Sequence, residues 1–222
     1  MPSVDLFADY FASLGLYFDL AKTRPVRRII MYAYDSGYTF PCSVAPNQVR
    51  RFNSQYVNGL LLSSKNPPGN INEYFWTNGV LNIASSTPLT TGEYLVAYTA
   101  GEELFENVPT LSGLQRFFAN SDDDNDRTKV QQVYIFNETT DKRYVELTLS
   151  VSLSFVPGIG LEPSHFSFSL NGTDWVTGSL NIPDLQPGQS ISVYIRCTIP
   201  KGTITGNLRD VALSIAGFEE QI

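Results

Sequence analysis

Alternating apolar and polar positions dominate the second half of the chain, between residues 130 and 217. Nearly every second residue is apolar over residues 145–155, and shorter runs of the same kind follow at 166–170, 191–195 and 211–215. Successive side chains of a strand point to opposite faces, so this period of two predicts strands with one buried face. Gly, Pro and Asn separate the runs at the spacing of a two-sheet sandwich.

The first half also has β patterning, with longer loops between the runs. The run IIMYAY, at residues 29–34, follows Pro25 and is typical of a buried strand. Asn78-Gly79, between YFWT and VLNIA, predicts a two-residue hairpin, because a type I′ turn needs positive φ at both positions. Residues 101–120 are less regular, and we expect a short helix over residues 111–118 with Thr110 as its cap.

The N-terminal segment, SVDLFADYFASLGLYF at residues 3–18, has the spacing of an amphipathic helix. Phe7, Phe11, Leu14 and Phe18 follow one another at intervals of four, three and four residues and share one face. We therefore expect an N-terminal arm over residues 1–22 that is partly helical. Its aromatic face either docks on its own domain or inserts into a neighbouring subunit.

Arg24, Arg27 and Arg28 form the densest basic cluster of the chain. A solvated strand edge is the default interpretation, and contact with a phosphate or an acidic partner is the alternative. Together with the apolar side chains of the arm they are the candidate partner-binding residues: Phe7, Phe11, Leu14, Phe18, Arg24, Arg27 and Arg28.

The polar run SDDDNDRTK, at residues 121–129, is the predicted domain boundary. It separates a β-rich domain over residues 23–122 from a β-sandwich domain over residues 129–222. Asp122, Asp124 and Asp126 have the spacing of a calcium loop, but Arg127 and Val133 occupy the positions where such a loop needs Gly and Glu. A solvated linker without a metal is expected.

Charge is unevenly distributed along this chain of 222 residues, whose net charge is −7. Residues 1–120 hold eight Lys and Arg against nine Asp and Glu, whereas residues 121–222 hold seven against thirteen. The acidic second half argues against nucleic-acid binding. No apolar run approaches the roughly 18 residues of a membrane span.

The N-terminus lacks the basic region of a secretion signal, so we expect synthesis and folding in a reducing cytoplasm. Cys42 and Cys197 are accordingly expected to be buried free thiols. His165 is the only histidine, which removes His-based triads and multi-His metal sites, and no phosphate-binding loop is present. Neither an enzymatic activity nor a cofactor is expected.

Three stretches of the second half carry a resemblance to a known family. They are FSLNGTDW at residues 168–175, LQPGQSISVYIRCTIP at 185–200, and the closing LRDVALSIAG. They resemble the immunoglobulin-like modules found in virion proteins of tailed bacteriophages, and the resemblance is confined to residues 130–217. It implies an immunoglobulin-like β-sandwich and a structural role, with no catalytic residues.

These features predict a structural virion protein, made in the host cytoplasm, whose partners are other virion proteins. A capsid decoration (cement) protein on the head lattice is favoured, because a near-neutral half beside an acidic half suits one lattice face and one solvent face. A tail, neck or baseplate protein is the alternative. Repeated weak contacts of a closed homo-oligomer, such as a trimer, suit a lattice.

Two other classes of protein remain open. A carbohydrate-binding or adhesion module would use Trp76 and Trp175, although both are expected in a core, with Trp175 covering one end of the second domain. An intracellular bacterial scaffold is the other.

Overall fold

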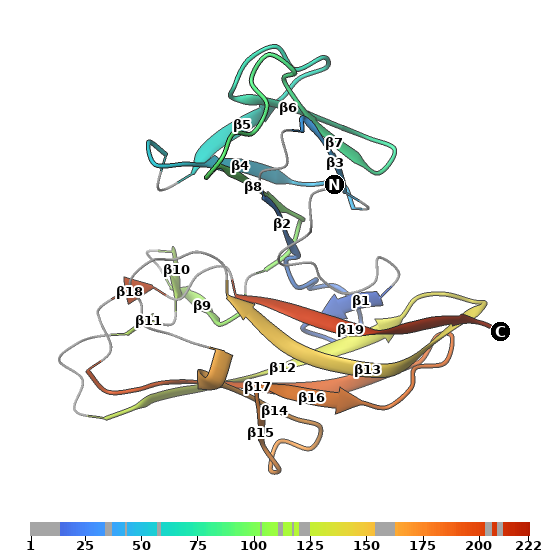
Figure 1. Cartoon of the computed structure of the whole chain (residues 1–222). Coiled ribbons are helices and arrows are strands. Elements are labelled where there is room, and N and C mark those ends of the chain that lie inside the picture. Colours follow the sequence, from blue (N-terminus) through green and yellow to red (C-terminus); the bar gives the residue numbers. More distant parts are fainter. Residues whose placement is uncertain are drawn as a thin grey trace. The chain divides into compact units, whose positions relative to one another are not determined.

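The computed structural model describes residues 14–33, 37–42, 44–56, 59–102, 104–110, 113–116, 118–119, 125–153, 163–202, 206–207 and 211–222. The described chain is mainly β (Figure 1). It divides into two compact units. The described residues of the first unit lie within Arg27–Ala100, and the second comprises Ser13–Val26 and Gly101–Ile222.

A seven-stranded sheet curled into a half-barrel forms the first unit. All neighbouring strands are antiparallel except β5 and β6. The strand order is β2 (Ile29–Ala33), β8 (Tyr94–Tyr98), β4 (Gln48–Phe52), β5 (Leu60–Ser64), β6 (Glu73–Thr77), β7 (Val80–Ile83) and β3 (Thr39–Pro41).

The curl brings the two edge strands of this sheet together through side chains. The rings of Tyr32 on β2 and Phe40 on β3 lie 5.2 Å apart, and the Tyr32 hydroxyl donates to the Pro41 carbonyl at 2.6 Å. Burial of apolar surface inside the curl stabilises it. The core consists of Tyr32, Phe40, Cys42, Val49, Leu62, Tyr74, Leu81, Ile83, Leu89, Leu95 and Ala97.

Two sheets form most of the second unit (Figure 1). One has the order β1 (Leu14–Tyr17), β12 (Arg127–Asn137), β17 (Ser190–Ile199), β14 (Phe166–Ser169) and β15 (Val176–Thr177). The other has the order β16 (Ser179–Ile182), β13 (Lys142–Leu153) and β19 (Val211–Gln221). The remaining elements are the pairs β9 (Glu106–Thr110) with β10 (Gly113–Arg116) and β11 (Phe118–Ala119) with β18 (Gly206–Asn207), and the 3₁₀ turn η1 (Pro163–His165).

The predicted alternation is confirmed where the side chains are described. Its buried members are Val133, Ile135, Leu147, Leu149, Val151, Phe166, Phe168, Val193, Ile195, Leu213 and Ile215. Three positions depart from it, and one of them, Ile191 near the start of β17, is half-buried. A β-bulge follows Val145, where Glu146 has a φ of 53°, so Val145 is only half-buried. Leu170 lies beyond the end of β14 and is exposed.

The predicted β2 strand and the Asn78-Gly79 hairpin are confirmed in the first unit. β6 and β7 pair across this turn, and Asn78 and Gly79 have φ angles of 48° and 78°, as a type I′ turn requires. Cys42 and Cys197 are both buried free thiols, as predicted.

The helical prediction for the N-terminal arm is wrong where it can be compared. Leu14–Tyr17 form β1, which pairs with β12, and residues 1–13, including Phe7 and Phe11, lie outside the described residues. The local sequence LGLY also alternates, and pairing with β12 leaves Leu14 2% and Leu16 3% exposed. This burial against a strand more than 100 residues away overrides helix propensity. No α-helix occurs in the described part of the chain.

The short helix predicted over residues 111–118 is wrong, because Gly113–Arg116 form strand β10. The predicted domain bounds stay a prediction. In the structure, the described residues 14–26 and 125–129 group with the second compact unit. Among the described residues, no helix has the length and apolar character needed to cross a bilayer.

Candidate functional site

The predicted partner-binding residues are distributed over both units. Leu14 is buried in β1 of the second unit. Arg24 makes a bidentate ion pair with Glu102, with its Nε at 2.8 Å and its Nη2 at 2.6 Å from the two carboxylate oxygens. Its guanidinium also lies 5.4 Å from the centre of the Phe18 ring. Leu14, Phe18 and Arg24 therefore stabilise the folded second unit.

The other two arginines belong to the first unit. The Arg27 guanidinium lies 4.8 Å from the ring centre of Tyr98. Arg28 is 6% exposed, and its backbone N–H donates to the Thr99 hydroxyl at 2.9 Å. The default interpretation of a solvated strand edge is therefore wrong for Arg28, because this residue is buried.

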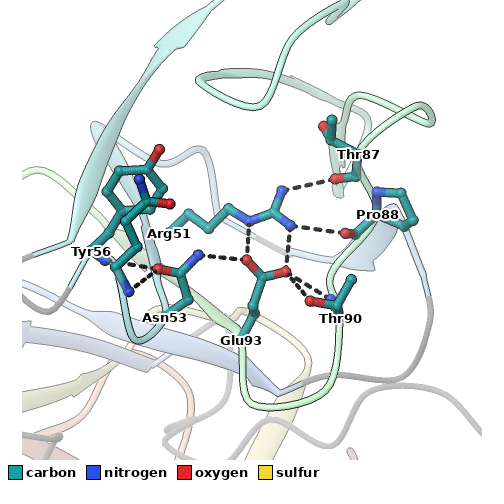
Figure 2. A network of polar contacts seen from close by, with 8 residues as sticks. Arg51, Asn53, Tyr56, Thr87, Pro88, Thr90 and Glu93 are labelled. Atoms are coloured by element: carbon teal, nitrogen blue, oxygen red, sulfur yellow. Dashed lines mark hydrogen bonds and ion pairs between the residues drawn. The ribbon is translucent and has the colours of Figure 1, made fainter.

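Among the described residues, a buried ion pair lies in the first unit, and the sequence pattern did not predict it. Arg51 on β4 donates its Nη2 to one carboxylate oxygen of Glu93 at 2.5 Å and its Nε to the other at 3.2 Å (Figure 2). Both side chains are buried, with 3% and 8% of their surface exposed. Arg51 also donates to the backbone carbonyls of Thr87 and Pro88, each at 2.8 Å.

Other donors of the protein occupy the remaining hydrogen-bond acceptor sites of the Glu93 carboxylate. It accepts hydrogen bonds from the Asn53 amide and from the N–H and hydroxyl of Thr90, all at 2.8 Å (Figure 2). Burial alone raises the pKa of the Glu93 carboxyl, but the hydrogen bonds from Arg51, Asn53 and Thr90 outweigh it and hold the pKa at about 2. A carboxylate so saturated cannot act as a general base, so this network is structural.

A second carboxylate of the first unit is held in the same way. The backbone N–H of Gly69 and the ammonium of Lys65 donate to Glu73 and lower its pKa to about 2. Within the described ranges, no three His, Cys, Asp or Glu side chains lie together in a group that could hold a metal. Asp122 and Asp124 of the rejected calcium loop lie outside those ranges.

The two tryptophans have different environments. Trp76 packs against the core of the first unit and donates its Nε1–H to the Cys42 carbonyl at 2.8 Å, as a core position predicts. Trp175 was also expected in a core, and it is half-buried. Its ring lies 4.3 Å from the guanidinium carbon of Arg196, which β17 directs away from the buried Ile195 and Cys197.

Aromatic side chains gather on that outward side of the five-stranded sheet. Tyr17 and Tyr134 are register partners on β1 and β12. Tyr194 on β17 is opposite Gln132 and diagonal to Tyr134. All of these side chains are half-buried. We call the surface formed by Tyr17, Gln132, Tyr134, Trp175, Tyr194 and Arg196 the outer aromatic face.

An ordered loop supports one end of the outer aromatic face. Gly172, with a φ of 79°, lies in this loop so that a Cβ there would be 3.6 Å from the Tyr194 ring. The Asn171 side chain accepts hydrogen bonds from the N–H groups of Thr173 and Asp174, each at 2.9 Å. The loop therefore holds one side of Tyr194 and sets the position of Trp175.

Charged side chains support the opposite end of this face. The Lys22 ammonium lies 4.6 Å from the ring centre of Phe136 and donates to Glu138 at 3.0 Å. The Tyr17 hydroxyl donates to the same carboxylate at 3.1 Å, and the Tyr17 ring meets Phe136 edge to face. Tyr17 is thereby fixed on the edge strand.

Comparison of the chain with protein-family models, curated proteins and solved structures gave no match. The candidate sites are therefore interpreted from their geometry alone. Tyr134 and Tyr194 occupy the outward positions of strongly alternating strands, which is the one sequence signal that could have located the outer aromatic face. Nothing local in the sequence places Tyr17 beside them.

Proposed function

We propose that this chain is a structural virion protein of a tailed phage, made in the host cytoplasm, and that it decorates the capsid. The observation that carries the proposal is the separation of charge between the two units. Residues 27–100 contain five Lys and Arg against three Asp and Glu, whereas residues 13–26 and 101–222 contain ten against seventeen. The first unit suits contact with a lattice, and the acidic second unit suits exposure to solvent.

The second unit supports the resemblance on which the proposal also rests. Gln186–Gln189 form a turn in which Gly188 has a φ of 72° and Gln189 N–H donates to the Gln186 carbonyl at 3.0 Å. Proline followed by glycine is typical of a type II turn. The turn leads directly into β17, and the two sheets with their alternating buried residues suit an immunoglobulin-like sandwich.

We propose no enzymatic activity and no cofactor for this chain. The two carboxylates with the most strongly lowered pKa values, Glu73 and Glu93, are saturated by donors from the protein itself. Perturbed pKa values arise in structural ion-pair networks as well as in active sites. Its partners would be other virion proteins, and a closed homo-oligomer, such as a trimer, would multiply weak contacts on a lattice.

A sedimentation experiment tests this proposal. The purified full-length chain is mixed separately with phage heads and with tails, both taken from a mutant lacking the gene, and each mixture is centrifuged. The proposal expects the chain to pellet with heads at a fixed ratio. Pelleting with tails alone would favour the tail, neck or baseplate alternative, and pelleting with neither would contradict a virion role.

Two truncations separate the role of the arm from that of the fold. Removing residues 2–12 leaves β1 in place, whereas removing residues 2–20 deletes the strand that pairs with β12. If the arm inserts into a neighbouring subunit, the shorter truncation abolishes pelleting with heads although the chain remains folded. Normal pelleting of this variant would remove the arm from the proposal. The longer truncation serves as the control for loss of the fold.

A further inference from the structure

We propose that the outer aromatic face of the second unit binds a neutral oligosaccharide. The inference rests on side chains of the five-stranded sheet and does not depend on the proposed virion role. It applies to an extended ligand lying across the strands rather than to a small molecule enclosed in a cavity.

The arrangement of the rings gives the face its length. Tyr17, Tyr134 and Tyr194 lie on three successive strands, and Trp175 contacts Arg196, two residues along β17 from Tyr194. Neighbouring strands are about 4.8 Å apart, so the three tyrosine positions extend over about 10 Å across the sheet, and Trp175 adds to the face along β17. A ligand that contacts all four rings must be a chain of several linked units.

Neighbouring groups of the second unit hold three of the rings in place. The Gly172 backbone lies against Tyr194, the Arg196 guanidinium lies over Trp175, and Phe136 meets the edge of Tyr17. Each aromatic side chain is still partly exposed. Rings fixed in this way present a preorganised apolar surface that loses little conformational entropy on binding.

The polar atoms of the face distinguish it from the aromatic groups inside the fold. The hydroxyls of Tyr32 and Tyr144 and the Nε1–H of Trp76 all bond to protein acceptors. By contrast, the hydroxyls of Tyr134 and Tyr194 have no such partner among the described residues. The face therefore combines apolar rings with hydroxyl groups that no acceptor among the described residues uses.

This combination fits a sugar, whose ring has an apolar C–H face and a rim of hydroxyl groups. Nucleic acid binding relies on several cations that neutralise phosphates, but the described cations of this face are Arg196 and Lys22, of which Lys22 is paired with Glu138, and the second unit is strongly acidic. A stable protein partner needs an apolar interface core, whereas Gln132 and Ser192 interrupt this face. A neutral carbohydrate matches both the rings and the low charge.

Calorimetric titration of the full-length chain tests the proposal. The probes are maltohexaose, cellohexaose, xylohexaose and mannohexaose, with heparin and a single-stranded DNA 20-mer as anionic comparisons. The proposal expects saturable binding of at least one neutral hexasaccharide. Binding of none of the four, or binding of an anionic probe alone, would overturn it.

Matched variants connect binding to the face. Trp175→Ala and Tyr194→Ala are expected to weaken binding about tenfold or more, because each removes a stacking ring. Tyr194→Phe keeps the ring, so it separates stacking from the hydroxyl and should lose less. Tyr38→Ala removes a tyrosine of the first unit that is 47% exposed, and it should bind like the parent chain. Equal losses of affinity in Tyr38→Ala and Tyr194→Ala would contradict the assignment. A Tyr194→Phe variant that keeps the circular dichroism spectrum of the parent chain shows that the fold is intact.

Discussion

The two units differ in how their cores are covered, and this difference accounts for the buried ion pair of the first unit. Among its described residues, the half-barrel of the first unit has no second sheet across its interior, and the loop containing Leu89 contributes to its core instead. A loop over a core brings backbone carbonyls that need donors, and Arg51 supplies them at Thr87 and Pro88 while Glu93 neutralises it. In the second unit the inward faces of two sheets supply the core, and the half-buried tyrosines of the outer aromatic face lie on the other side of the five-stranded sheet.

Buried charge in this chain follows from architecture rather than from catalytic chemistry. When one sheet covers another, the backbone groups of both are already paired between strands, so only side chains enter the core unpaired. A curled sheet covered by a loop must also satisfy backbone groups, and a buried ion pair does this only when all of its hydrogen bonds are made. The predictions below test this difference, and the single tryptophan in each unit, Trp76 or Trp175, reports on it by fluorescence.

The largest expected effect is that of Arg51→Ala. It leaves Glu93 charged without its partner and two buried carbonyls without donors, which should lower the free energy of unfolding of the first unit by about 3–5 kcal/mol. Urea denaturation followed by Trp76 fluorescence in a Trp175→Phe background measures this loss.

The double variant Arg51→Met with Glu93→Leu is the control for the charge itself. Removing both charges should recover part of the stability, because no unpaired ion remains in the interior. If the double variant is less stable than Arg51→Ala, the ion pair contributes more to the free energy of unfolding than the pairing of its two charges with each other.

Acid is expected to destabilise the first unit before the second. The pKa of Glu93 is about 2 in the folded chain, below its value in the unfolded chain, so its contribution is complete above about pH 5 and is lost as the pH falls towards 2. The loss should be on the order of 2–3 kcal/mol. Urea denaturation at pH values between 6 and 2.5, reported by Trp76, measures it.

Glu93→Gln should flatten that pH dependence, although Glu73, whose pKa is also about 2, keeps a part of it. If the free energy of unfolding of Glu93→Gln depends on pH as steeply as that of the parent chain, the network does not lower the pKa of Glu93.

Asn137→Ala removes a buried polar side chain of the second unit and should have a smaller effect than Arg51→Ala. The buried Asn137 amide donates to the carbonyls of Lys142 at 2.8 Å and Leu185 at 3.0 Å. Truncation leaves both acceptors unsatisfied and should cost about 2 kcal/mol. The measurement is urea denaturation followed by Trp175 fluorescence in a Trp76→Phe background, and an unchanged midpoint would contradict the expectation.

Arg24→Ala should have the smallest effect. The Arg24–Glu102 pair is bidentate, but its side chains are 56% and 39% exposed, so the loss should be below about 1 kcal/mol and should shrink further in salt. Denaturation at low and high ionic strength measures it. A loss as large as that of Arg51→Ala would show that exposure does not govern the strength of these pairs.

The sequence predicted those elements whose cause is local. Alternation located the long strands of the second unit, and Asn78-Gly79 located a turn because both residues accept positive φ. Features that depend on distant partners were missed. Strand β1 forms because β12 offers it an edge, and Arg51 meets Glu93 across 42 residues. Arg51 lies two residues after Val49 on β4, so both side chains point to the buried face of the strand. The sequence therefore indicates that Arg51 is buried, but it does not indicate its partner.

Hydrogen–deuterium exchange of the full-length chain, measured free and bound to phage heads, identifies the unit that meets the lattice. We expect new protection in peptides from residues 27–100, while peptides covering the outer aromatic face at residues 128–136 and 192–198 exchange at the same rate in both states. Protection confined to residues 128–136 and 192–198, with residues 27–100 unchanged, would show that the first unit does not bind the head.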